Sequence, residues 1–181
     1  MTSKKKYTIA WVLIIAAICW MGCFSHWTEK ERREFREKCD ATDSTDNITF
    51  QMVGFSYEEI EPLLIRHLRN GSQADSFYVH FSRYRYDSVR STYSEATDTR
   101  FCVNDTYQFV VKNAPPFVLA DMKMVMWAQY TMGGEGYGCV MGDYTINGVR
   151  YQDANPSFIK PGFRYPWEKA DSAEVGKKNK K

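Results

Sequence analysis

The feature that most constrains this chain is an apolar run near its start, at residues 7–27. These 21 positions contain no Asp, Glu, Lys or Arg. At about 1.5 Å of rise per residue, a helix of this length spans roughly 30 Å, which is the thickness of the hydrocarbon core of a bilayer. Trp11, Trp20 and Trp27 suit the two membrane interfaces. We therefore expect a transmembrane signal-anchor at residues 7–27.

Two other interpretations of this run remain open. A cleaved secretory signal ends in small residues, whereas this run ends in the sequence CWMGC, with large residues where small ones are needed. The pair Gly22-Cys23 is the ending at which bacterial lipoproteins are processed and acylated, although Trp20 replaces the usual Leu-like residue. We therefore place the retained anchor first, lipidation of Cys23 second and simple cleavage third.

The basic residues on the two sides of the run give conflicting indications of its orientation. Residues 4–6 are three lysines, but segment 28–38 after the run holds five Lys and Arg. We favour a cytoplasmic tail at residues 1–6, because these lysines adjoin the run and resemble the basic start of a signal. The expected location is then a single-pass membrane protein whose following domain is extracytoplasmic.

The rest of the chain has the composition of one globular domain. Removing the first 27 of the 181 residues leaves 154, which is the size of a single domain. Aromatic residues make up 15% of the chain, and this favours strands. The net charge of +2 provides no general attraction for polyanions, so we expect no nucleic-acid partner.

Polar segments flank the expected domain. Thr28 and Glu31 form a capping-box pattern, which predicts a short exposed helix over 28–38. Residues 39–46 are polar and turn-forming, so residues 28–46 are expected to be a helical stalk and a linker. Residues 167–181 lack apolar mass and are basic, and they predict a disordered tail.

Between these segments, residues 47–166 show mostly the two-residue periodicity of strands. Ser56 and Glu59 predict a single helical turn over 56–60, because Pro62 would cost an ongoing helix about 3 kcal/mol; one continuous helix remains the alternative. Segment 85–100 is expected to be a long loop, and the stretch from Asn155 an irregular surface segment. Strands are predicted at 48–54, 63–69, 76–82, 106–113 and 117–132.

The turns between these strands indicate a mainly β fold. Asn147-Gly148 has the sequence of a two-residue hairpin turn, in which both central residues need positive φ. Within 117–132, the even-numbered residues from Val118 to Ala128 are all apolar and are expected to form one buried face. We therefore predict an antiparallel β-sandwich or open barrel, preceded by the transmembrane helix and the short helical stalk.

Two histidines flank a second predicted hairpin, whose turn is Asn70-Gly71. If facing positions have numbers that sum to 146, His67 opposes Val79 and the ring of His80 points to the other face. A slip of one residue would place both rings on one face. Because no acidic residue stands with these histidines in a recognisable metal-ligand pattern, we assign no metal site.

Aromatic side chains near this hairpin are the candidate ligand contacts. Arginines alternate with tyrosines from Arg83 to Arg90, a pattern that suits single-stranded nucleic acid but also a solvated strand end. Net charge near zero favours the strand end, and tyrosines also stack on sugar rings. The candidate contacts are Tyr78, His80, Tyr84 and Tyr86.

No pattern in the sequence identifies an enzyme or a cofactor. The glycines between 133 and 142 lack the Gly-Lys-Ser/Thr ending of a phosphate loop. Ser88, Cys102 and Cys139 lie in no recognisable nucleophile motif. We therefore assign no catalytic residues and no cofactor.

Three cysteines follow the apolar run, at positions 39, 102 and 139. In an oxidising compartment two of them can pair and one thiol is left over. We favour Cys102 with Cys139, because both lie inside the expected domain. Three reduced thiols remain the alternative.

These observations predict a membrane-anchored extracytoplasmic β-domain that acts as a binding or scaffolding module of the cell envelope. Its expected partners are the lipid bilayer, through residues 7–27, and an envelope protein or glycan. Two alternatives remain open: an envelope hydrolase whose site is assembled from distant residues, and a small subunit of a membrane complex.

Overall fold

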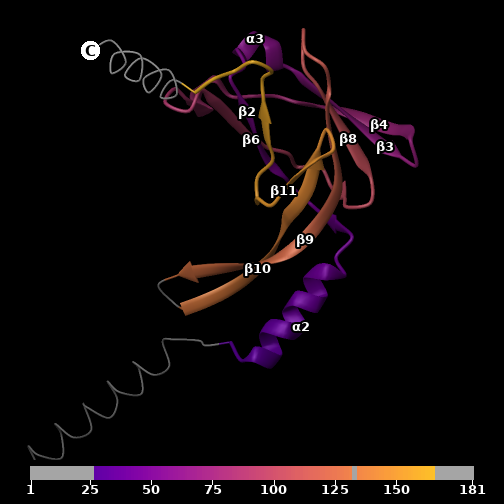
Figure 1. Cartoon of the computed structure of the whole chain (residues 1–181), viewed down its shortest axis with the longest axis vertical. Coiled ribbons are helices and arrows are strands. Elements are labelled where there is room, and N and C mark those ends of the chain that lie inside the picture. Colours follow the sequence, from indigo (N-terminus) through magenta and orange to yellow (C-terminus); the bar gives the residue numbers. More distant parts are fainter. Residues whose placement is uncertain (1–26, 132–133, 166–181) are drawn as a thin grey trace, which may run out of the picture. The chain divides into compact units, whose positions relative to one another are not determined.

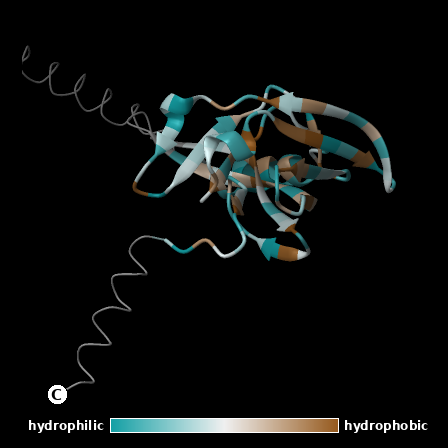
Figure 2. Cartoon of the chain, turned by 90° about the horizontal axis from the view of Figure 1, so that it is seen from above, coloured by the Kyte–Doolittle hydropathy of each residue, from teal (hydrophilic) through white to brown (hydrophobic). Residues whose placement is uncertain are grey.

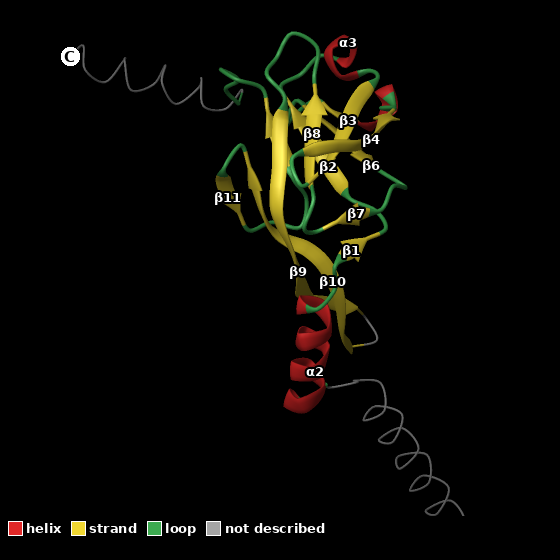
Figure 3. Cartoon of the chain, turned by 90° about the vertical axis from the view of Figure 1, so that its right-hand side faces the viewer, coloured by secondary structure: helices red, strands yellow, loops and turns green. Residues whose placement is uncertain are grey.

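The computed structural model describes residues 27–131 and 134–165. Strands make up about half of the described chain (Figure 3), and nearly all described strand pairs are antiparallel, so the predicted mainly β fold is confirmed. Most of the predicted anchor, including Cys23, and the predicted tail at 167–181 lie outside the described residues. Among the described helices, none is long and apolar enough to cross a membrane.

Contacts divide the chain into two compact units. One holds the described residues up to Ala41 together with Met126–Cys139, and the other holds Thr42–Val125 with the described residues from Val140 onward. The two longest strands, β9 (Phe117–Thr131) and β10 (Gly134–Ile146), contribute residues to both units. Each unit is described by itself below.

The first unit contains α2 (Glu29–Asp40), close to the predicted helix at 28–38. The Thr28 hydroxyl accepts a hydrogen bond from the Glu31 N–H, and a Glu31 carboxylate oxygen accepts one from the Thr28 N–H at 2.7 Å. The predicted capping box is therefore present, and it satisfies N–H groups that the helix leaves without an internal partner.

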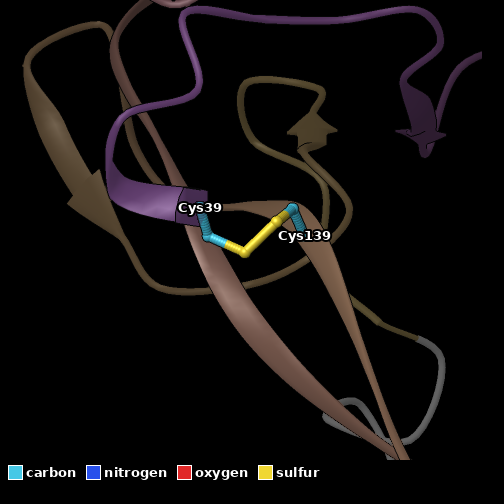
Figure 4. The surroundings of a disulfide bond; sticks show 2 residues. All are labelled: Cys39 and Cys139. Carbon is cyan, nitrogen blue, oxygen red and sulfur yellow. A yellow bond between two sulfur atoms is a disulfide. The ribbon is translucent and has the colours of Figure 1, made fainter. Parts of the chain in front are cut away.

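A disulfide and a small aromatic cluster hold the first unit together. Cys39, in the last turn of α2, is bonded to Cys139 of β10 (Figure 4), and their Cα atoms are 5.4 Å apart. The Trp27 ring packs on Phe35 and Tyr137, with centroid separations of 5.4 and 4.9 Å. The predicted Cys102–Cys139 pairing is wrong, because the helix brings Cys39 within bonding range of Cys139 whereas Cys102 belongs to the other unit and is a free thiol.

The second unit contains a six-stranded sheet in the order β11-β10-β9-β8-β3-β4. β3, β4 and β8 lie side by side in it (Figure 1). The strand predicted at 63–69 is confirmed, as is the single helical turn before it, α3 (Tyr57–Ile60). The bounds of the remaining strands are β3 (Leu63–Arg69), β4 (Ser72–Val79), β8 (Thr106–Val110) and β11 (Val149–Tyr151).

A four-stranded sheet in the order β12-β2-β6-β5 completes the unit, with the small pair of β1 (Ser44–Thr45) and β7 (Phe101–Cys102). Its strands are β2 (Thr49–Val53), β5 (Tyr86–Asp87), β6 (Thr92–Ala96) and β12 (Ser157–Ile159), and β12 pairs with β2 in parallel.

Two segments predicted to lack strands contain them. The predicted loop at 85–100 holds β5, β6 and the end of the short 3-10 helix η1 (Arg83–Arg85), and the irregular stretch from Asn155 holds β12. The strand β6 was missed because its sequence, TYSEA, is mostly polar; pairing with β2 along its whole length makes it a strand.

Aromatic rings from both sheets meet in the core. Phe50 of β2 contacts Phe109 of β8 at a centroid separation of 5.2 Å, and Phe158 of β12 lies 4.2 Å from Phe109. All three side chains are fully buried. Hydrophobic and hydrophilic residues are mixed along the strands (Figure 2), as expected where one face of a strand is buried and the other is not.

The buried face of β9 changes at Asp121. Phe117 and Leu119 are buried before this residue, whereas Met122 and Met124 are buried after it. Asp121 has a φ of 52°, which interrupts the two-residue alternation. The single apolar face predicted for 117–132 is therefore correct for these two methionines and wrong for Val118.

Both predicted Asn-Gly hairpin turns are present. Asn147 and Gly148 have φ values of 51° and 79°, and they connect β10 to β11. Asn70 and Gly71 connect β3 to β4 in the same way. The predicted register of that hairpin is wrong: His67 opposes Asp75, because the two-residue turn sets Arg69 opposite Ser72 and a bulge follows His67.

Candidate functional site

A polar hollow in the second unit lies between the end of β4 and the chain that leaves β6. Its volume is about 260 Å³. β4 is an edge strand of the six-stranded sheet, so one of its edges has no strand partner. β5 pairs only with the first part of β6, so the later part of β6 has no strand partner on the edge that β5 leaves open. The lining residues are Phe77, Tyr78, Val79, His80, Glu95, Ala96, Thr97, Asp98 and Thr99.

The first wall of the hollow follows from the alternation of side chains along β4. Val79 is buried, which leaves Tyr78 and His80 on the opposite, exposed side. Tyr78 is 61% exposed. The hollow therefore has an accessible aromatic ring at its edge.

Glu61 fixes the orientation of His80. The Nδ1 atom of His80 lies 2.6 Å from Oε1 of Glu61, whose other oxygen accepts a hydrogen bond from the N–H of Phe81. Partial burial raises the pKa of Glu61, but the hydrogen bonds from His80 and Phe81 outweigh this effect and hold that pKa below its usual value. Because an ionised carboxylate only accepts, Nδ1 carries the proton that it shares with Glu61.

Thr97 provides a buried hydroxyl in the wall of the hollow. The residue is 3% exposed, and its backbone N–H is bonded to the carbonyl of Ile48. Its Oγ1 atom has no hydrogen-bond partner among the residues that the structure describes. This oxygen is itself shielded from solvent, so Thr97 contributes to the wall of the hollow by packing.

The charges around the hollow are acidic and partly compensated. A carboxylate oxygen of Glu95 accepts a hydrogen bond at 2.7 Å from the guanidinium group of Arg85, a residue outside the hollow. The Glu95 side chain is only 14% exposed. Asp98, at the rim, is exposed. No lysine or arginine is among the lining residues. The hollow therefore presents oxygen acceptors and hydroxyl groups without a cation to attract an anionic ligand.

Two of the four predicted contact residues line this hollow, and two do not. Tyr78 and His80 do. Tyr84 is fully exposed on η1, and Tyr86 packs on Tyr93 with a centroid separation of 4.6 Å. Glu95, Thr97, Asp98 and Thr99 were missed, because their segment was predicted to be a loop and short polar residues carry no motif.

A second cluster of ionisable side chains surrounds His67, which is buried. Its Nε2 atom lies 2.7 Å from Asp105 and its Nδ1 atom 3.2 Å from Asp75, while its ring stacks on Tyr107. Arg69 also donates to Asp105, and this contact, with that from His67, holds the Asp105 pKa below its usual value despite burial.

Both ring nitrogens of His67 are therefore occupied by carboxylates within the protein. Burial raises the pKa of the neighbouring Tyr107 to about 12, and its hydroxyl accepts a hydrogen bond from the N–H of Cys102. Among the described residues, no group of three His, Cys, Asp or Glu side chains could hold a metal ion. This arrangement is that of a satisfied structural histidine.

Comparisons with known proteins found no relative of this chain. No protein-family model matches the chain, and neither a curated protein nor a solved structure matches it.

Proposed function

We propose that this chain is a membrane-anchored binding or scaffolding module of the cell envelope, with its β-domain on the extracytoplasmic side. The apolar run at 7–27 tethers the chain to the bilayer, with its N-terminus inside, or Cys23 does so through an attached lipid. Residues 28–46 connect the tether to the domain at 47–166, and the hollow beside Tyr78 and His80 is the contact surface.

The observation that carries the proposed location is the Cys39–Cys139 disulfide. Disulfides persist in oxidising compartments and are rare in the cytoplasm. This bond closes a separation of 100 residues along the chain, which includes most of the β-domain. An extracytoplasmic domain preceded by a basic, apolar N-terminus is consistent with both features.

The binding role is supported by the hollow and by the rigidity of its scaffold. Aromatic rings of both sheets pack against one another in the core, and we interpret the domain as a β-sandwich on this basis. Binding sites are commonly placed on the loops and strand ends of such rigid scaffolds. The envelope-hydrolase alternative has less support, because His67 is fully engaged by Asp75 and Asp105.

The location is tested by labelling cysteines in living cells. Tyr84 is fully exposed, so Tyr84→Cys provides an accessible thiol for a membrane-impermeant maleimide, with the parent chain as the background control. We expect labelling of the variant before the inner membrane is opened, and retention of the chain in membranes after alkaline washing. Labelling only after permeabilisation, or recovery of the chain as a dissolved protein, would overturn the proposal.

Mass measurement of the N-terminus from the same membranes separates the tethers. Intact Met1 or Thr2, an acylated Cys23 and a new unmodified N-terminus have three different masses. The first two results support a tether, and the third contradicts it.

The binding role is tested with the full-length chain in mild detergent, mixed with isolated envelope material. Retention of either envelope protein or envelope glycan supports the module. Recovery as a monomer that retains neither would contradict it, and a fixed stoichiometry with membrane subunits would instead favour the small-subunit alternative.

A further inference from the structure

The first unit contains the end of the β9–β10 ribbon, residues 126–131 and 134–139, which we call the ribbon end. Glu135 is its only Asp, Glu, Lys or Arg, and the nearest flanking charges in the sequence are Lys123 and Asp143. A face of an antiparallel pair that contacts water is usually polar or charged. This composition therefore indicates that the ribbon end contacts something other than water.

α2 and the residue before its cap cover one face of the ribbon end. Cys139 is bonded to Cys39 in the last turn of α2 (Figure 4). The Tyr137 ring packs on those of Trp27 and Phe35, with centroid separations of 4.9 and 6.4 Å. Because Cys139 and Tyr137 are two residues apart on one strand, their side chains lie on the same face. That face therefore has a protein partner.

The opposite face carries an exposed tryptophan. A Cβ atom on Gly138 would lie 3.3 Å from the side chain of Gln129, so these two residues share a face. Side chains alternate along a strand, so this face is the one opposite to that of Cys139. Trp127, two residues before Gln129, belongs to the same face and is 48% exposed. The face that α2 does not cover thus presents a large, accessible aromatic ring.

The position of Trp27 places a bilayer beside the ribbon end. Trp27 is the last residue of the apolar run, whose other residues lie outside the described chain. In the proposed function this run fills the hydrocarbon core, so its last residue lies at the membrane interface. If Cys23 carries the lipid instead, four residues separate it from Trp27, a span of at most about 14 Å. Under either tether, Tyr137 is close to the lipid headgroups, because its ring packs on Trp27.

We infer that the ribbon end is a second membrane contact, which rests on the headgroup layer of the bilayer through Trp127 and Tyr137. Tryptophan and tyrosine suit this layer because each combines an apolar ring with a polar group that stays hydrated. The near absence of charge lowers the cost of removing the ribbon end from water. The Cys39–Cys139 bond holds it beside the tether. The inference rests on the proposed tether and adds a surface separate from the hollow.

A bilayer is a better occupant for this face than a second copy of the chain. Every tethered copy has lipid beside Trp27 and Tyr137, whereas a second copy would have to meet the first and align with it. The experiment therefore uses the full-length chain in lipid nanodiscs that hold one copy each, made from phosphatidylcholine and phosphatidylglycerol.

The fluorescence of Trp127 is the measurement. Subtracting the emission of Trp127→Phe from that of the parent chain isolates this residue from the other four tryptophans. Trp127→Tyr provides a second subtraction, and the two should agree. Lipids brominated in the upper part of the acyl chain quench tryptophans at the interface, whereas iodide quenches those in water. We expect brominated lipid to remove about half or more of the Trp127 emission, and iodide to have little effect.

The control moves the tryptophan to the second unit. Tyr84 is fully exposed there, so Tyr84→Trp in the Trp127→Phe background provides an indole ring in water. Its emission should be quenched by iodide and should change little with brominated lipid. This control shows that both quenchers act as intended on the same chain in the same discs.

The outcomes separate this inference from the proposed tether. If the chain stays in the discs but iodide quenches Trp127 and brominated lipid does not, the inference fails and the tether stands. Equal lipid quenching of Trp127 and of the tryptophan in Tyr84→Trp would also overturn it. Protection from iodide that appears only in discs with two copies would assign this face to a second copy instead. A chain that does not enter the discs at all would overturn both the tether and the inference.

Discussion

The Nε2 atom of His67 lies 2.7 Å from Oδ2 of Asp105, and both residues are at least nine-tenths buried. Arg69 donates to the same carboxylate, so Asp105 holds two side chains of β3 to the turn that precedes β8. A buried carboxylate is tolerated only when such donors replace the water it has lost. The pair therefore belongs to the stability of the β-domain.

The first prediction concerns the charge of Asp105. Asp105→Asn keeps the shape of the side chain but directs N–H donors at Arg69 or His67, so we expect the free energy of unfolding to fall by about 1–3 kcal/mol. Asp75→Asn is the matched control, because Asp75 contacts the other nitrogen of His67 from a side chain that is 68% exposed, and its loss should cost under about 1 kcal/mol. Denaturant unfolding of the full-length chain measures both, and equal losses would contradict this assignment.

The second prediction is the acid dependence that follows from the same contacts. Hydrogen bonds from Arg69 and His67 hold the pKa of Asp105 in the folded chain below its ordinary value of 3.8. A depressed carboxyl pKa stabilises the fold above the unfolded value, and this stabilisation is lost as the pH falls through the folded value. Unfolding measured from pH 6 downward should therefore show stability declining below about pH 4. The decline should be shallower in Asp105→Asn, and identical profiles would show that Asp105 is not responsible.

The third prediction concerns the bond between Cys39 and Cys139. Because the cysteines are 100 residues apart, their cross-link removes many conformations from the unfolded chain, and its loss should cost about 2–5 kcal/mol. Thermal unfolding should therefore occur at a lower temperature in Cys39→Ser, or after addition of a reductant. Cys102→Ser is the control, since Cys102 is a free thiol, and reductant should still lower its unfolding temperature. A parent chain that is insensitive to reductant would refute the disulfide.

The sequence predicted the elements that local chemistry determines. The Thr28 capping box, the turn at Asn147-Gly148 and the strand after Pro62 depend on residues within a few positions of one another. Long-range pairings were not predictable in the same way. β6 is a strand because it pairs with β2, although its own residues are mostly polar.

The errors in the buried face of β9 and in the candidate site also come from features that the local sequence does not reveal. A single positive φ at Asp121 interrupts the alternation along β9, and periodicity alone contains no sign of such a residue. Tyr78 and His80 could be nominated from their residue types. Thr97 could not, because only its burial beside residues distant in sequence places it in the wall of the hollow.

The last prediction concerns Gly54, which lies after β2 with a φ of 78°. A Cβ atom at this position would be 2.3–2.9 Å from atoms of the Phe163 side chain, closer than van der Waals contact permits. Gly54→Ala therefore combines an unfavourable backbone conformation, about 1–2 kcal/mol, with overpacking, about 1–3 kcal/mol.

Gly71 is the matched control for this substitution: its φ is 77°, but no atom lies within 4 Å of the position that an added methyl group would take. Gly71→Ala should therefore lose the backbone contribution alone, and denaturant unfolding of the two variants should differ by the cost of displacing Phe163. In a Phe163→Gly background that difference should largely disappear, because all the side-chain atoms that obstruct the methyl group, including the Cβ atom at 2.9 Å, are gone. A difference that persists would show that Phe163 is not its cause.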